Sequence, residues 1–199
     1  MTNPPAVTDL WIDVFNRVCG RTAHELKGAL NGVSVNLEVV RSRAARPDTP
    51  ASAVSAYAGA AASQLDTVIA LSEALLALGR PAREPVDIGL AVRHLATLLA
   101  PAARGDGRRL EVDASVSGLG QSSAGGLAAR AAIGACLLAA IDASLHVRCS
   151  VRDDMSLQIT SCDSAPIEAG PGVVVAAGQA GIRVEQSNAR TSISITFPH

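Results

Sequence analysis

Apolar residues recur every three or four positions along the first forty residues of the chain. The stripe comprises Ile12, Phe15, Cys19, Ala23, Leu26, Leu30, Val33, Leu37 and Val40. Steps of three and four place apolar side chains on one face of an α-helix. The pattern therefore predicts a helix over residues 8–43, which would be roughly 50 Å long at about 1.5 Å per residue.

A second stripe with the same spacing follows a break at residues 46–50, where two prolines and an aspartate favour a turn. The stripe comprises Val54, Ala58, Ala61, Leu65, Val68, Leu71, Leu75 and Leu78. It predicts a helix over residues 51–78, which Gly79 and Pro81 end. Two such helices form a hairpin with one continuous apolar seam. Pairing of two hairpins in a dimeric four-helix bundle would bury this seam. The alternative is a monomer whose second domain covers it.

The pattern changes after a linker at residues 79–85. Short apolar or alternating segments predict strands at 86–88, 110–114, 146–152, 157–162, 182–185 and 192–197. Longer apolar segments predict helices at 90–100, 127–143 and 173–179, with Pro101 interrupting the first and a loop at 118–126. Strands in one sheet with helices on one face form an α/β sandwich. The predicted fold class is α+β, with a helical hairpin over residues 1–80 and a sandwich over 86–199.

The composition of the chain argues against several classes of function. The net charge is −1, so no basic surplus points to nucleic acid or an anionic membrane. The N-terminus lacks the pattern of a signal peptide, and no apolar run approaches the roughly 20 residues that span a bilayer. We therefore expect a cytoplasmic protein. The four cysteines are scattered without a C-x-x-C pair, which predicts free thiols and no metal site.

One histidine of the first helix has the surroundings of a nucleophile. His24 follows the stripe residue Ala23, so its side chain points away from the seam. Neutral imidazole is a nucleophile near pH 7, and Glu25 can accept a hydrogen bond from one ring nitrogen. Arg21 and Lys27 lie three residues away on either side and can offset the charge of a phosphoryl group. Alternatively, Arg21 and Glu25 form an ordinary helix pair and Lys27 is a solvated surface charge.

Two further residues lie on the same helix face as His24. Gly28 is one turn further on and leaves room for a partner to approach, and Asn31 is two turns further on. A glycine inside a helix costs up to about 1 kcal/mol relative to alanine, so a functional gain would offset that cost. We predict that Gly28 and Asn31 contact a partner protein. The alternative is that both are neutral surface residues.

The order of these elements resembles the core of bacterial sensor histidine kinases. His24-Glu25-Leu26-Lys27 is similar to the family's H-box, in which the histidine accepts the phosphoryl group and the next acid polarises it. The segment 85–88 resembles the entry into the family's ATP-binding domain, and 135–143 resembles its N-box helix. Asp163 resembles the aspartate of its first glycine box. The resemblance implies a Bergerat-type fold for the second domain.

The departures from this family concern the nucleotide site. Ala135 and Ala139 stand where the N-box has asparagines, and a methyl group cannot ligate Mg²⁺, which takes oxygen ligands. Both glycines that follow the glycine-box aspartate are missing in the segment after Asp163, and no later glycines have the spacing of a phosphate cradle. An acceptor histidine beside a degenerate ATP site resembles the histidine phosphotransferases built on a kinase scaffold.

This second resemblance implies a homodimer that relays phosphoryl groups between His24 and aspartates of response-regulator receiver domains. A hybrid histidine kinase is a further candidate partner. We expect no ATP-dependent kinase activity and no cofactor of the chain's own, because the receiver supplies Mg²⁺. Gly28 lacks the polar side chain that orients water in phosphatase-competent relatives, so strong phosphatase activity is not expected. Two alternatives remain open, a non-catalytic pseudokinase scaffold and an atypical active kinase.

Overall fold

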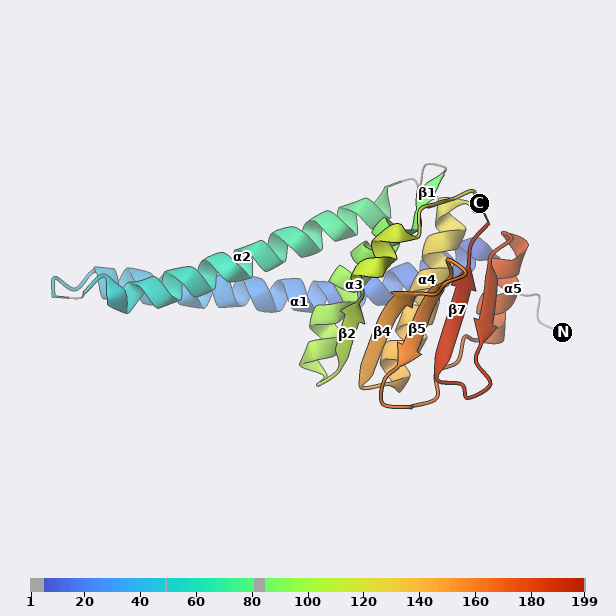
Figure 1. Cartoon of the computed structure of the whole chain (residues 1–199). Helices are drawn as coiled ribbons and strands as arrows, with labels where there is room; N and C mark the ends of the chain where they lie inside the picture. Colours follow the sequence, from blue (N-terminus) through green and yellow to red (C-terminus); the bar gives the residue numbers. More distant parts are fainter. Residues whose placement is uncertain (1–5, 49, 81–84, 199) are drawn as a thin grey trace.

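The computed structural model describes residues 6–48, 50–80 and 85–198. It begins with two long helices, α1 (Val7–Ala44) and α2 (Ser52–Gly79), which pack against each other as a hairpin. Both helices begin and end within one residue of the predicted ranges. The end of the hairpin that joins the two helices projects away from the rest of the molecule (Figure 1).

Polar contacts tie the two helices of the hairpin together. Near the projecting end, the Arg43 guanidinium carbon lies 4.7 Å from the ring centroid of Tyr57, a cation–π contact. In the middle, Asn36 Nδ2 donates a 3.1 Å hydrogen bond to Gln64 Oε1. A Cβ on Gly32 would overlap the Gln64 amide, so the end of this flexible side chain occupies the space that glycine leaves.

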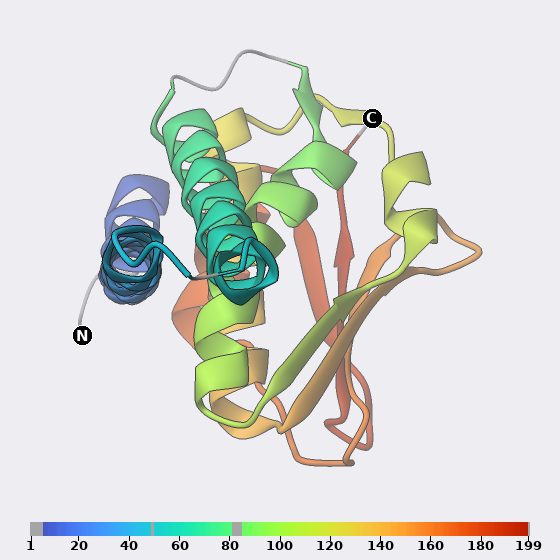
Figure 2. The same ribbon diagram turned by 90° about the vertical axis from the view of Figure 1, so that its left-hand side faces the viewer.

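The remainder of the chain is a five-stranded sheet with helices on one face. The strands are β2 (Arg109–Val112), β4 (His146–Val151), β5 (Leu157–Ser161), β6 (Arg183–Gln186) and β7 (Ser192–Thr196), in the spatial order β2-β4-β5-β7-β6. Only the pairing of β2 with β4 is parallel. The helices α3 (Ile88–Gly105), α4 (Gly126–Ala143) and α5 (Pro171–Gln179) cover one face of the sheet, and the hairpin packs against these helices (Figure 2). These elements confirm the predicted α+β class.

Three local predictions for the sheet domain are wrong. The first predicted strand is β1 (Val86–Asp87), and it pairs with β3 (Gln121–Ser122) in a separate two-stranded sheet rather than joining the main one. The segment 118–126 is therefore not entirely loop, and a short 3₁₀ turn, η1 (Ala114–Gly118), precedes it. Pro101 does not end its helix, because α3 continues to Gly105. Burial of Leu98, Leu99 and Ala103 offsets the backbone hydrogen bond that proline cannot donate.

The first half of α1 packs against the helices of the sheet domain. Val14, Val18 and Thr22 are its fully buried residues, and a Cβ on Gly134 of α4 would overlap Cγ1 of Val14. This buried face differs from the predicted stripe, whose members Ile12, Leu30 and Leu37 are about half exposed. The sheet domain thus covers part of α1 but leaves much of the predicted seam open.

Two helices are long and apolar enough, by length and composition alone, to cross a membrane. One is α4, of which 72% of the apolar window is buried inside the protein, as expected for a core helix. The other is α2, of which only 22% of the window is buried. The exposed apolar surface of α2 therefore remains without a covering element in a single chain.

Candidate functional site

His24 lies on an exposed part of α1, beside a cleft between this helix and the last turn of α3. The cleft has a volume of about 380 Å³. It is lined by Gly20, Arg21, His24 and Glu25 from α1, and by Ala102, Gly105 and Asp106 from the end of α3 and the residue after it. The structure therefore brings three of the predicted site residues, Arg21, His24 and Glu25, to one solvent-accessible place.

Arg21 is held by the sheet domain rather than by its own helix. Its Nη2 atom lies 2.5 Å from Oδ1 of Asp142 in α4, and Nη2 of Arg17 lies 2.5 Å from the other oxygen, Oδ2, of the same carboxylate. Within the part of the chain that the structure describes, Arg21 forms no ion pair with Glu25, so the alternative of an ordinary helix pair is wrong. Asp142 thus joins the helix of His24 to the core of the sheet domain.

Glu25 turns toward α3 and not toward the imidazole. Its Oε1 atom lies 3.9 Å from the position that a Cβ on Gly105 would occupy, which is ordinary van der Waals contact. Among the described residues, the side chains of His24 and Glu25 form no hydrogen bond, either with each other or with another residue. Consecutive helix residues point in directions that do not face each other, which explains why the predicted hydrogen bond is not formed.

The other predicted residues of this site lie along α1, outside the cleft. Lys27, Gly28 and Asn31 are all exposed. A Cβ on Gly28 would have no heavy atom within 4 Å, so the helix surface is open here. Among the described residues, Lys27 has no ion-pair partner. These three residues form an accessible strip next to His24.

The residues that would correspond to a nucleotide site have different surroundings. Ala135 is buried in α4 and Ala139 is half-buried there. The residue before Ala135 is Gly134, where α1 makes its close approach through Val14. This part of α4 therefore offers methyl groups and packing contacts instead of oxygen ligands.

Asp163 is hydrogen-bonded to its own chain. Its Oδ1 accepts hydrogen bonds from the hydroxyls of Ser161 at 2.6 Å and Ser144 at 2.7 Å, and its Oδ2 accepts one from the backbone N–H of Leu145 at 2.7 Å. These donors hold the pKa of Asp163 well below its usual range, because they stabilise the charged form. Asp163 therefore closes the turn between α4 and β4.

Sequence reasoning missed the residues that the sheet domain contributes to the His24 cleft. Gly105 and Asp106 were beyond the predicted end of their helix, and Asp142 lies 121 residues from its partner Arg21. One signal was available for Asp142. It is the only acidic residue in an otherwise almost wholly apolar helix, and such a charge needs a partner or solvent.

No protein-family model matches this chain, and a search of the curated proteins finds no match. What is established is its architecture. The protein is a long N-terminal helical hairpin followed by a mixed α/β domain, and the accessible histidine of its hairpin faces a cleft between the two.

Proposed function

We propose that this protein is a histidine phosphotransferase of two-component signalling. It would relay phosphoryl groups between His24 and the aspartates of response-regulator receiver domains. The observation that carries this proposal is the exposed imidazole beside a cleft of about 380 Å³, with one arginine and one glutamate on the same helix. A residue that accepts phosphate from another protein must be reachable in this way.

The transfer step is a nucleophilic substitution at phosphorus. An unprotonated ring nitrogen of His24 attacks the phosphorus of the receiver's aspartyl phosphate. The bond from phosphorus to the aspartate oxygen breaks, and its electron pair stays on the carboxylate. The product is a phosphoramidate on His24, and the reverse step passes the group to a second receiver. The receiver brings the Mg²⁺, so this chain needs no cofactor of its own.

Arg21 and Lys27 would offset the charge of the transferred group, since phosphoryl transfer depends mainly on positioning and electrostatics. Asp142 restricts Arg21, because their 2.5 Å contact fixes the guanidinium next to the cleft. The proposed role of Glu25 is to orient the imidazole, which requires a change of its side-chain conformation when the receiver binds. Gly28 and Asn31 would lie under the receiver.

The second part of the proposal is that the protein does not use ATP. Ala135 and Ala139 offer no oxygen ligand to Mg²⁺. The carboxylate of Asp163 accepts three hydrogen bonds no longer than 2.7 Å from its own chain, so it is engaged in holding a turn. We propose that residues 86–199 are a degenerate, Bergerat-type domain and that residues 1–80 form the phosphotransfer domain.

The third part of the proposal is a homodimer formed through the hairpin. Large apolar side chains on the two helices are exposed, namely Ile12, Leu30, Val35, Leu37, Leu65, Ile69 and Leu76, with exposed fractions of 48–64%. A four-helix bundle made with a second hairpin would bury residues of this set. The proposed partners are a second copy, receiver domains and a hybrid kinase, with no role for nucleic acid or membrane. Light scattering of the purified protein measures the oligomeric state.

The proposed function is tested by asking whether phosphate is transferred from a receiver domain to His24. The protein is mixed with phosphorylated receiver domains, and acid-labile phosphate is located by mass spectrometry. We expect label on His24, none on His24→Ala, and full labelling of His146→Gln, which removes a histidine of the sheet. Equal labelling of wild type and His24→Ala would refute the proposal. Receiver binding without any labelling would instead identify a non-catalytic scaffold.

A further inference from the structure

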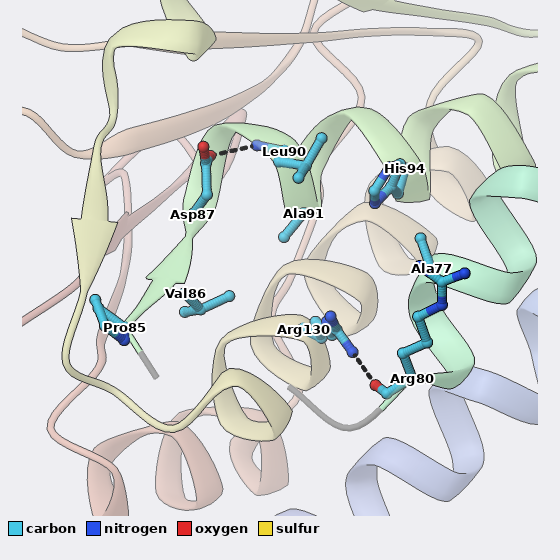
Figure 3. Close-up of a pocket in the computed structure, with 9 residues that line it drawn as sticks. All are labelled: Ala77, Arg80, Pro85, Val86, Asp87, Leu90, Ala91, His94 and Arg130. Carbon is cyan, nitrogen blue, oxygen red and sulfur yellow. Dashed lines mark hydrogen bonds between the residues drawn. The ribbon is translucent and has the colours of Figure 1, made fainter. Parts of the chain in front are cut away.

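A second cavity lies where the end of α2 meets the sheet domain, at a different place from His24 (Figure 3). Its volume is about 770 Å³. Its walls come from four elements, α2, β1, α3 and α4. Ala77, Val86, Leu90 and Ala91 form its apolar surface. The size and apolar lining are those of a small-molecule site.

The polar side chains of this cavity are mainly basic. Arg80, His94 and Arg130 line it together with one acid, Asp87. In Figure 3, His94 and Arg130 approach the same space from α3 and α4. Asp87 caps the start of α3, because its Oδ1 accepts a 2.7 Å hydrogen bond from the backbone N–H of Leu90. The cavity thus carries two arginine charges and one carboxylate that already has a structural partner.

Among the described residues, the basic side chains of the cavity form no ion pairs, although the Asp87 carboxylate acts on His94 from the same cavity. Arg130 donates through Nη1 to the carbonyl oxygens of Leu78 at 3.1 Å and Arg80 at 3.0 Å, which closes the end of α2. No carboxylate among residues 6–48, 50–80 and 85–198 forms an ion pair with Arg80, His94 or Arg130. Burial lowers the pKa of Arg130, and burial followed by the Arg130 charge lowers the pKa of His94. A bound anion would stabilise the charged forms of both side chains and so raise both pKa values.

We propose that this cavity binds a small organic phosphate, a phosphate monoester with an apolar body. The apolar body lies against Val86, Leu90 and Ala91, and the dianionic head faces Arg80, His94 and Arg130. Charge-assisted hydrogen bonds from arginine suit this head group. The bound molecule bridges α2, α3 and α4, so it fastens the end of the hairpin to the sheet domain. This site is independent of phosphotransfer at His24.

The proposal is tested by calorimetric titration of the whole chain with 1-naphthyl phosphate. The controls are 1-naphthol, which keeps the body, and inorganic phosphate, which keeps the head. We expect one site per chain for 1-naphthyl phosphate and much weaker binding of both controls. Absence of heat with millimolar 1-naphthyl phosphate would overturn the proposal, and so would equally tight binding of 1-naphthol.

Variants place the binding in the cavity. Arg80→Gln and His94→Gln should each weaken binding about tenfold, the usual effect of losing one charge-assisted hydrogen bond. Ala91→Leu should also weaken it, because the larger side chain takes up space in the cavity. Arg93→Gln is the matched control, since Arg93 bonds Ser117 at 2.8 Å and does not line the cavity. Equal losses in Arg93→Gln and Arg80→Gln, or no loss in either, would refute this location.

Discussion

The contact between α1 and α4 depends on one glycine, and Gly134→Ala tests it. A Cβ at this position would overlap Cγ1 of Val14 and lie 3.6 Å from Cδ2 of Leu95. Val14 is only 1% exposed, and the χ1 angle of a β-branched side chain in a helix is restricted. The substitution therefore forces either Val14 or the whole of α1 to shift.

The magnitude follows from two opposing effects. Alanine stabilises a helix interior by up to about 1 kcal/mol relative to glycine. Overpacking a buried contact costs about 1–3 kcal/mol. Gly134→Ala should therefore lower the free energy of unfolding by roughly 0–2.5 kcal/mol. Gly59→Ala in α2 is the matched control, because nothing lies within 4 Å of its Cβ position. It should raise that free energy by about 0.5–1 kcal/mol.

Urea unfolding followed by circular dichroism and by tryptophan fluorescence measures both variants. The only tryptophan, Trp11, lies in the docked part of α1 with its ring centroid 5.5 Å from that of Phe15, so its emission reports on this end of the helix. Adding Val14→Ala should remove the penalty of Gly134→Ala, a coupling of about 1–3 kcal/mol. A Gly134→Ala protein as stable as Gly59→Ala would refute the close packing of α1 on α4.

Two further predictions concern carboxylates. Asp142→Asn removes the ion pairs with Arg17 and Arg21, whose side chains are 41% and 30% exposed, so the unfolding free energy should fall by at most about 1 kcal/mol. The loss should shrink in about 1 M NaCl, and a loss that salt leaves unchanged would contradict the ion-pair account. Hydrogen bonds hold the pKa of Asp163 below its unfolded value, so its contribution to stability is present at neutral pH and disappears as the pH falls below about 4. Asp163→Asn should therefore flatten the acid side of the stability profile in pH-dependent unfolding, whereas parallel profiles would show that Asp163 does not stabilise the fold.

Helices and strands could be predicted from the sequence where a regular spacing of apolar residues extends over many positions. The hairpin helices end within one residue of the prediction because each has a stripe of eight or nine apolar positions. The strands β6 and β7 were likewise predicted, as the segments 182–185 and 192–197. The pair β1–β3 was not, because two-residue strands carry no detectable alternation. Pro101 misled the prediction of α3, since tertiary burial outweighs one missing hydrogen bond.

Of the candidate site beside His24, only the residues that lie together on α1 could be predicted from the sequence. Arg21, His24 and Glu25 were found from their local spacing, and they line the same cleft. Asp142 and Asp106 were not found, because contacts between distant segments depend on how the hairpin docks. The docked face of α1 was missed for the same reason. A stripe of apolar residues does not reveal which of two neighbours, a second copy or the sheet domain, each position will meet.

The central claim is that phosphate reaches His24 from a receiver domain and not from ATP. The most direct test compares two labelling reactions of the same purified protein, one with radiolabelled ATP alone and one with labelled phospho-receiver in the absence of nucleotide. We predict acid-labile label on wild type only in the second reaction, and none on His24→Ala in either. Labelling of His24 by ATP alone, or no labelling by any phosphorylated receiver, would contradict this account.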